Sequence, residues 1–267
     1  MTDSLWESAG ANVWSATDFS RGPWHPDFCH GGPVTALLTR AIEHFDEGSW
    51  VLAQHHIELT RPVPVDRPLR LDTVLDRPGR KVSVVATRLN DGEVTVTKSR
   101  AVRIRRSDLA LPGDLPDPTV PLAPPDSSPV AHLEWEAVTG TAFHSHSVDF
   151  RIAEGAMTEP GPLAAWIRLR VNVVPHEEPS GTQRLTAVSD FPNGITNALD
   201  PGRFSFINPD LSLNMVREPR GHWMGLRAAT HYGDAAAATG VAFAEAELHD
   251  LDGRVGRATQ SLLIDPV

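Results

Sequence analysis

A segment from Cys29 to Phe45 places the strongest constraint on how this chain folds. It opens with Gly31, Gly32 and Pro33, and apolar residues then recur at helical spacing, at Val34, Leu37, Leu38, Ala41, Ile42 and Phe45. Proline suits the first position of a helix, where its missing N–H costs no hydrogen bond. The apolar stripe is broad, so we expect a helix that is buried on most sides.

The residues between this helix and Arg106 are typical of antiparallel strands. Asn90-Asp91-Gly92 is a strong hairpin signal, and a further short strand is expected over 12–18. The main strands are expected over 50–59, 69–75, 82–89 and 94–104. One buried helix wrapped by an antiparallel sheet is therefore the predicted architecture of this half.

Residues 107–130 are rich in proline and show no apolar periodicity. Such a composition favours a semi-rigid, extended linker. We therefore predict an N-terminal domain over 1–106 and a C-terminal domain over 131–267. In the second domain a short helix is expected over 180–190, and strands over 142–152, 166–173, 205–216, 223–231, 241–248 and 255–264.

The two predicted domains match each other in order. Gly32 corresponds to Gly181, Arg61 to Arg217 and Asp91 to Asp252, and the separation within these pairs grows along the chain. Small loop insertions explain the growing separation, as in a duplicated domain that has diverged. The order of elements predicts an α+β fold, a tandem (double) hotdog in which each half is a long helix wrapped by an antiparallel sheet.

Polar residues distinguish the second half from the first at equivalent positions. Asp190 in the second helix corresponds to Ala41, while Asn208 corresponds to Leu52 and Gln260 to Ser99. An aspartate in the middle of a buried helix carries a desolvation penalty unless it has partners. Asn208 and Gln260 are the candidate partners, so we predict that these three side chains form a functional site.

The chain resembles the acyl-CoA thioesterase II family, the double-hotdog hydrolases of fatty acyl-CoA. The resemblance covers nearly the whole chain outside the linker, and it rests on the order and spacing of short motifs: His30-Gly31-Gly32, Ala187-Val188-Ser189-Asp190, Arg217-Glu218-Pro219, Trp223 and Arg257-Ala258-Thr259-Gln260-Ser261. In that family an aspartate, a threonine and a glutamine hold the attacking water. The resemblance assigns the aspartate to Asp190 and the glutamine to Gln260, and it puts Asn208 at the threonine position, which is a departure.

This resemblance implies direct hydrolysis of an acyl-CoA thioester, with no cofactor and no metal. Asp190 would act as the general base, and Asn208 and Gln260 would fix the water. Backbone N–H groups near Gly31 and Gly32 would stabilise the oxyanion at the helix N-terminus. Two alternatives remain: a non-catalytic acyl-CoA-binding protein, and an enoyl- or hydroxyacyl-thioester hydratase. Hotdog hydratases pair an aspartate with a histidine, and no histidine lies near Asp190 in the sequence.

Each of these residues also has a structural interpretation. Asp190 could hydrogen-bond at a helix C-terminus, Gln260 could be a satisfied sheet residue, and Gly31-Gly32 could serve tight helix–sheet packing. Cys29-His30 suggests a thiol nucleophile, but adjacent residues rarely present such a pair correctly.

Two other clusters are candidate binding sites. His144 and His146 would lie on one strand face, as in a metal site, yet no third ligand is evident. An arginine cluster could meet coenzyme A phosphates or form a solvated strand face; it comprises Arg100, Arg103, Arg105 and Arg106.

The charge balance limits the partners that this chain can have. Its formal net charge is −10, whereas nucleic-acid and anionic-membrane binding need a basic face. A single cysteine excludes an intramolecular disulfide and suits a reducing compartment. The first residues show no basic stretch followed by an apolar core, and no apolar run approaches a membrane span. We therefore expect a cytoplasmic protein without membrane insertion or nucleic-acid binding. By analogy with other hotdog proteins we also expect a homo-oligomer.

Overall fold

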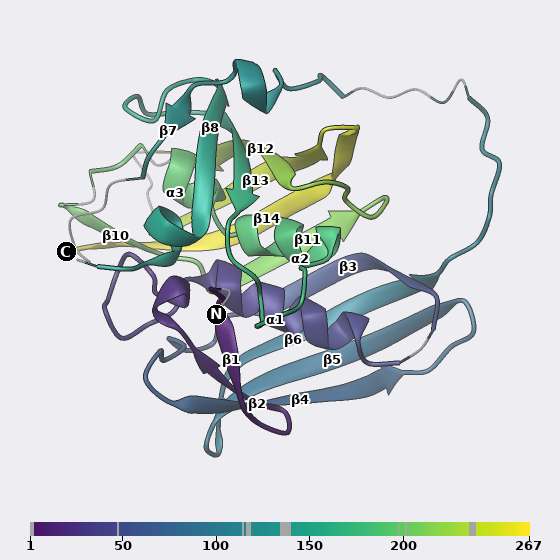
Figure 1. Ribbon diagram of the computed structural model, residues 1–267. Coiled ribbons are helices and arrows are strands. Elements are labelled where there is room, and N and C mark those ends of the chain that lie inside the picture. Colours follow the sequence, from purple (N-terminus) through teal and green to yellow (C-terminus); the bar gives the residue numbers. More distant parts are fainter. Residues whose placement is uncertain are drawn as a thin grey trace.

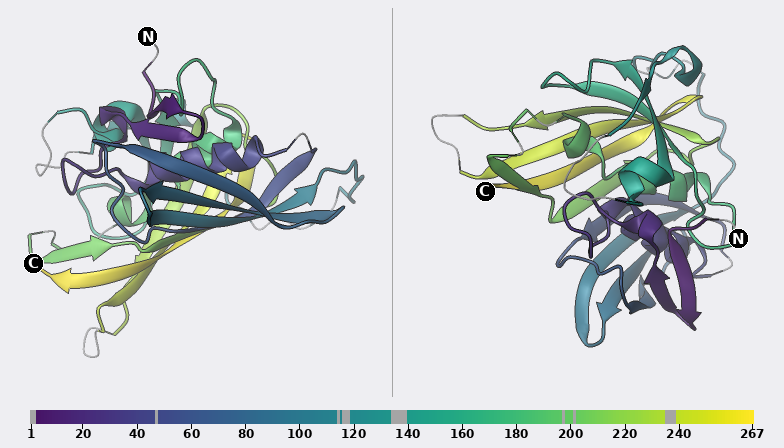
Figure 2. Two further views of the ribbon diagram at one scale, coloured as in Figure 1. Left: turned by 90° about the horizontal axis from the view of Figure 1, so that it is seen from below. Right: turned by 60° about the vertical axis from the view of Figure 1, so that its left-hand side comes forward.

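The structure is a computed structural model of the chain. It describes residues 3–46, 48–113, 115, 119–133, 140–196, 198–200, 202–234 and 239–267. Figure 1 shows strands of the N-terminal half below and strands of the C-terminal half above, with two helices, α1 and α2, near the middle. The two further views in Figure 2 show the same division into blue strands and green-to-yellow strands.

The first half contains one long helix, α1 (Gly31–Glu43), and a short 3-10 helix over Asp18–Ser20. Its strands are β1 (Trp6–Gly10), β2 (Val13–Ala16), β3 (Trp50–Glu58), β4 (Pro68–Arg77), β5 (Val82–Asp91) and β6 (Val94–Arg105). The expected strands over 50–59, 69–75, 82–89 and 94–104 are confirmed to within a few residues, whereas β1 was not anticipated.

The helix α1 is buried as its apolar pattern predicted, because every residue from Gly32 to Thr39 is buried. Its start differs in detail from the expectation. The helix begins at Gly31 with His30 as the N-cap, so Pro33 is the third helical residue and not the first. Proline is still tolerated there, since the first turn leaves its N–H groups without intrahelical partners.

The second half contains the helices α2 (Gly181–Val188) and α3 (Pro192–Thr196), a 3-10 helix over Pro125–Ser127 and a π-helix over Phe143–Ser147. Its strands are β7 (Val130–Ala131), β8 (Val148–Glu154), β9 (Leu163–Leu169), β10 (Phe204–Ile207), β11 (Asp210–Met215), β12 (Trp223–His231), β13 (Val241–Asp250) and β14 (Gly253–Pro266).

Three expectations for this half are corrected. The strand expected over 142–152 begins with the π-helix and becomes extended only at Val148. The strand expected over 205–216 is two strands separated by Asn208 and Pro209, because proline has no N–H to donate to a sheet. The helix expected over 180–190 ends at Val188.

The strands of the described residues form one antiparallel sheet that runs through both halves. Its order is β1-β2-β4-β5-β6-β3-β11-β14-β13-β12-β9-β8-β7, with β10 paired to β14 beside this path. The halves join where β3 pairs with β11, with Gln54 opposite Asn214 and Glu58 opposite Asp210. The hydrophobic core extends across this junction.

The helices α1 and α2 pack against each other in opposite directions. In the middle of the contact, the Thr35 hydroxyl donates to the Thr186 carbonyl at 2.8 Å. At one end, the Glu43 carboxylate accepts hydrogen bonds from Ser180 and Gln183. At the other end, Asp190 lies beside the start of α1. The start of each helix therefore lies beside a carboxylate from the end of the other helix.

The described parts of the predicted linker run along the outside of the molecule in Figure 1. Its last part packs on the second half, where the Trp166 indole donates to the Ala123 carbonyl at 2.7 Å and Leu122 is buried against Trp166. Residues 114 and 116–118 lie outside the described part of the chain. No described helix is long and apolar enough to cross a membrane.

Candidate active site

Asp190 lies in the turn between α2 and α3, after the C-cap residue Ser189. The helix expected over 180–190 would have included Asp190, and this part of the expectation is wrong because α2 ends at Val188. The Asp190 side chain is nevertheless only 6% exposed, so its charge needs partners as expected. Because α2 ends just before it, the carboxylate can turn toward the start of α1.

The structure brings the two predicted amides onto this carboxylate. The Asn208 Nδ2 donates to Asp190 Oδ1 at 2.7 Å, and the Gln260 Nε2 donates to the same oxygen at 2.9 Å. Asn208 comes from the break between β10 and β11, and Gln260 from the interior of β14. Two amide donors on one oxygen hold the carboxylate in a fixed orientation.

His30 completes the surroundings of Asp190, and the sequence analysis did not assign it there. Its Nδ1 lies 2.9 Å from Asp190 Oδ2 and 3.0 Å from the Gly32 amide nitrogen, whose N–H it accepts as the N-cap. The position of His30 directly before Gly31-Gly32 was the available signal. His30 belongs to the other half of the chain, so nearness to Asp190 in the sequence gives no sign of this contact.

One nitrogen cannot accept the Gly32 N–H and donate to Asp190 at the same time. When Nδ1 is unprotonated, it accepts from Gly32, and a protonated Asp190 can donate to it. When Nδ1 carries the proton, it donates to the Asp190 carboxylate. The two side chains are therefore arranged to share one proton.

The glycines at the start of α1 have different neighbours. A Cβ on Gly31 would lie 2.6 Å from Asp190 Oδ2, so the missing side chain makes room for the carboxylate. A Cβ on Gly32 would lie 2.1 Å from the Ala187 carbonyl oxygen, so this residue permits the close contact of the two helices. The N–H of Gly32 lies 3.0 Å from His30 Nδ1 and donates to it when that nitrogen is unprotonated; the oxyanion role of Gly31 and Gly32 stays a prediction.

These residues line a common cavity with several that the sequence analysis did not select. Asp190, Asn208, Gln260 and His30 form its polar side; the other lining residues are Pro23, Trp24, Leu133, His144, Phe191, Asn193, Gly194 and Phe206. Within the described residues, two buried amide oxygens of this lining have no hydrogen-bond partner, Gln260 Oε1 and Asn193 Oδ1. Such acceptors are suited to the hydrogens of a bound water or substrate.

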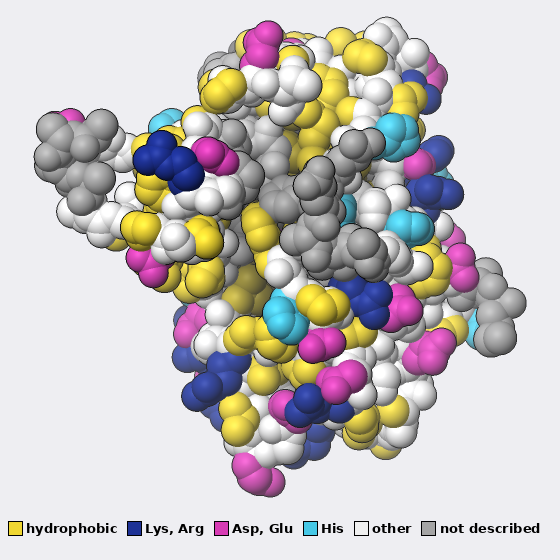
Figure 3. Space-filling view, turned by 90° about the vertical axis from the view of Figure 1, so that its left-hand side faces the viewer, with side chains coloured by type: hydrophobic (Ala, Val, Ile, Leu, Met, Phe, Trp, Pro, Cys, Tyr) yellow, Lys and Arg dark blue, Asp and Glu magenta, His cyan; other side chains and the backbone are white. Residues whose placement is uncertain are grey.

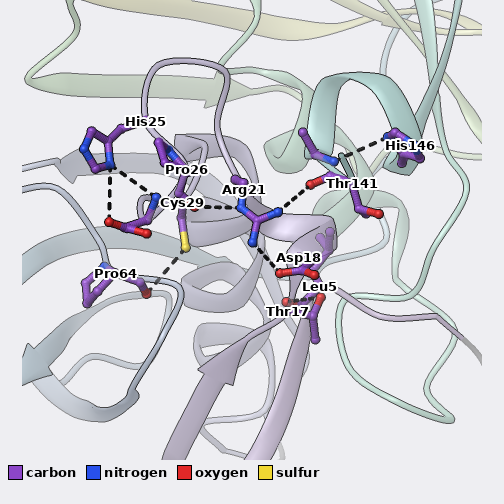
Figure 4. Close-up of polar contacts among 12 residues, drawn as sticks. Leu5, Thr17, Asp18, Arg21, His25, Pro26, Cys29, Pro64, Thr141 and His146 are labelled. Carbon is purple, nitrogen blue, oxygen red and sulfur yellow. Dashed lines mark hydrogen bonds and ion pairs between the residues drawn. The ribbon is translucent and has the colours of Figure 1, made fainter. Parts of the chain in front are cut away.

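The other candidate clusters are placed differently. Burial raises the pKa of the Cys29 thiol, which opposes formation of a nucleophilic thiolate, and Figure 4 shows its sulfur near the Pro64 carbonyl. His144 is buried while His146 is exposed, and the described residues contain no group of three or more potential metal ligands.

The predicted arginine cluster is divided between ion pairs. Arg103 is buried and paired with Asp46, whereas Arg100 is exposed and paired with Asp76. On the face seen in Figure 3, acidic and basic side chains are interspersed, and neither kind forms a continuous field.

Two family models match the chain. The acyl-CoA thioesterase N-terminal domain matches residues 20–104, and the acyl-CoA thioesterase C-terminal domain matches residues 112–264. The chain belongs to the acyl-CoA thioesterase family. This acyl-CoA thioesterase is therefore an enzyme of thioester hydrolysis, as the resemblance predicted.

Solved structures show the same hotdog fold. The acyl-CoA thioesterase II TesB2 of Mycobacterium marinum has a TM-score of 0.67 at 16% identity, covering 98% of this chain and 95% of its own. A putative thioesterase II of Thermobifida fusca has a TM-score of 0.71 at 17% identity, with coverage of 98% and 95%. A hot dog protein of unknown function from Alicyclobacillus acidocaldarius has a TM-score of 0.72 at 15% identity, with coverage of 97% and 95%. A comparison with curated proteins found no match.

Proposed function

We propose that this thioesterase hydrolyses acyl-CoA by direct attack of a water molecule, with Asp190 as the general base. The observation that carries the proposal is the buried Asp190 carboxylate, held on one oxygen by Asn208 and Gln260. The orphan acceptor Gln260 Oε1 supports a water at this place, since the water can donate one hydrogen to the amide and one to the carboxylate. No covalent intermediate is needed, because a thioester carbonyl is already electrophilic.

His30 acts on Asp190 as a positioning residue in this mechanism. Before the reaction, its Nδ1 proton orients the carboxylate across 2.9 Å. When Asp190 takes the proton of the water, His30 keeps its Nδ1 proton, so the imidazole orients Asp190 without accepting a proton itself. The N-terminus of α1 at Gly31 and Gly32 contributes positive potential at the place where negative charge develops on the substrate.

A hotdog hydratase remains the second candidate because of one specific observation. The absence of a histidine near Asp190 in the sequence was the argument against it, and His30 lies 2.9 Å from that carboxylate. Two amides on Asp190 and membership of the thioesterase family favour hydrolysis. A 2-enoyl-CoA substrate separates the two reactions, since hydration removes the conjugated double bond without releasing free thiol.

We propose further that the hotdog fold is a tandem one, with domains over 1–106 and 131–267 joined by the linker 107–130. The register of β3 and β11 supports this. The offset that relates Arg61 to Arg217 also relates Gln54 to Asp210 and Glu58 to Asn214. The observed pairs are Gln54 with Asn214 and Glu58 with Asp210. Gln54 therefore pairs with the counterpart of Glu58, and Glu58 pairs with the counterpart of Gln54, as at a two-fold axis. We also propose a cytoplasmic location and a homo-oligomeric state.

The test is release of free thiol from acyl-CoAs of increasing chain length. We expect Asp190→Asn to lower kcat by about 10²–10⁴-fold, the usual contribution of a general base. Glu43→Gln is the matched control, because the partly buried Glu43 carboxylate lies at the start of α2 but outside the cavity of Asp190; kcat should stay near that of wild type.

Each result decides between the candidates. If Asp190→Asn retains full activity, the mechanism is wrong although the reaction stands. If wild type binds acyl-CoA and releases no thiol from any chain length, the chain is the non-catalytic binding protein.

A further inference from the structure

His144 lines the cavity of Asp190 but has no part in the mechanism above. It lies on the π-helix Phe143–Ser147, and its side chain is buried, whereas the neighbouring His146 is exposed. Single π-helical turns are rare and occur frequently at functional sites. The irregular turn directs one of two neighbouring histidines into the cavity wall.

The π-helix is held rigidly by the first half of the chain. Phe143 donates its N–H to the Arg21 carbonyl at 2.9 Å, and the Arg21 guanidinium donates to the Thr141 carbonyl at 3.1 Å, as Figure 4 shows for Arg21 and Thr141. The Ser147 hydroxyl donates to the Phe19 carbonyl at 2.7 Å. The His144 imidazole is therefore fixed relative to α1 and not carried on a free loop.

Aromatic packing connects the same turn to the catalytic groups. The Phe143 ring lies 5.0 Å from the His30 ring and 5.6 Å from the Phe191 ring, centroid to centroid. Phe143 also approaches Gly32, where an added Cβ would lie 2.9 Å from its Cε1. His144 thus follows directly after the residue that packs on the start of α1.

The protonation state of His144 suits a donor. Burial lowers its pKa to about 4, and the positive charges of His30 and His146 add to this effect. Asp190 is the acidic group of the same cavity, and its carboxylate is engaged by His30 and the two amides. At neutral pH the His144 imidazole is therefore uncharged and carries one N–H.

The mechanism still lacks a side-chain donor for the oxyanion. The amides of Asn208 and Gln260 both donate to Asp190. We propose that the His144 N–H donates a hydrogen bond to the thioester carbonyl oxygen and stabilises the oxyanion. This inference rests on the proposed hydrolysis.

The step balances with the groups in the cavity. The water oxygen forms a bond to the carbonyl carbon, its proton goes to Asp190, and the carbonyl π electrons move to the oxygen that His144 contacts. The electron pair then returns, the carbon–sulfur bond breaks, and coenzyme A leaves as a thiolate. His144 keeps its proton throughout and acts only as a hydrogen-bond donor.

The first test compares His144→Phe with His146→Phe. Phenylalanine fills the space of the imidazole without an N–H. We expect His144→Phe to lower kcat by about 10²–10³-fold, as loss of one oxyanion donor does, with little change in KM because the interaction strengthens in the transition state. His144→Gln, which keeps an N–H donor, should recover part of the loss. His146→Phe alters the same turn outside the cavity and should keep the wild-type kcat.

A second measurement does not depend on turnover. The probe is a ketone analogue of acyl-CoA in which a methylene replaces the sulfur, and its carbonyl stretching frequency is recorded in the bound state. A donor to this oxygen lowers the frequency, so the shift should be present in wild type and Asp190→Asn and absent in His144→Phe.

The outcomes separate this inference from the proposed function. Unchanged kcat in His144→Phe, or a rise in KM alone, overturns the role of His144 while hydrolysis stands. A carbonyl frequency in His144→Phe equal to that in wild type likewise overturns the role of His144. Wild type that releases no thiol refutes the proposed hydrolysis, and the carbonyl shift then still reports whether His144 contacts the bound carbonyl.

Discussion

Gly31 and Gly32 are neighbours in the chain, yet their missing side chains serve different contacts. The space beside Gly31 is occupied by the end of the Asp190 side chain, and the space beside Gly32 by the Ala187 backbone and the Phe143 ring. A carboxylate can rotate away from an added methyl group, whereas a backbone carbonyl inside a helix pair cannot. The two positions therefore differ in what a substitution should change.

We expect Gly31→Ala to reduce kcat strongly while leaving the free energy of unfolding nearly unchanged, because the methyl group displaces the Asp190 carboxylate. Gly32→Ala should lower the free energy of unfolding by about 1–3 kcal/mol, the usual cost of overpacking a core. Chemical denaturation and thiol-release kinetics on both variants check this. Equal losses of stability in the two variants would contradict it.

At the scale of elements, the pair α1 and α2 is held together at both ends by exchanged carboxylates. Ser180 is the N-cap of α2, and its hydroxyl accepts the Gln183 N–H at 3.0 Å while donating to Glu43 at 2.8 Å. Burial raises the pKa of Glu43, and the hydrogen bonds from Gln183 and Ser180 oppose this effect. The cap therefore stabilises its own helix and the end of the other.

Ser180→Ala should lower the free energy of unfolding by about 1–2 kcal/mol, since it removes the helix cap and one hydrogen bond to the partly buried Glu43 carboxylate. The pKa of Glu43 should rise further, because it loses a donor to its charged form. Urea denaturation at neutral pH measures the first effect, with the exposed Ser8→Ala as the control. A loss no larger than that of Ser8→Ala would show that the exchange of carboxylates contributes little.

Each half of the described chain buries a histidine whose pKa is strongly lowered. Burial lowers the pKa of His55 to about 3 and that of His144 to about 4. His55 is held by the Ser99 hydroxyl at 2.9 Å and the Thr39 hydroxyl at 3.3 Å. Below about pH 6.5, the usual pKa of histidine, the unfolded chain binds protons at these residues that the folded chain does not, so stability should fall with acidification.

We expect each of these histidines to contribute a loss of about 1.4 kcal/mol per pH unit as the pH falls from about 6.5 toward about 5. His55→Gln should remove the contribution of His55 and flatten the pH dependence accordingly. His25→Gln is the control, because His25 is half exposed. Denaturation curves at several pH values test this, and parallel pH profiles for wild type and His55→Gln would refute it.

The sequence determined most of the elements because their signals are local. The apolar spacing after Gly32 specified α1, and alternating residues with Asn90-Asp91-Gly92 specified the β5–β6 hairpin, where Gly92 has a φ of 57°. The comparison of the two halves also selected Asp190, Asn208 and Gln260. These side chains meet in the structure, because a buried polar group is costly without partners, and Asp190 and Asn208 replace apolar residues of the first half.

The tertiary structure alone decided how these residues meet. His30 and Asp190 lie in different halves of the chain, and they touch because two helices pack in opposite directions, which no local pattern encodes. The π-helix at His144 likewise depends on contacts with distant segments, such as that of Phe143 with Arg21. Local propensity fixes where helices and strands form, whereas the geometry of a site arises from the packing of whole elements, where burial outweighs propensity.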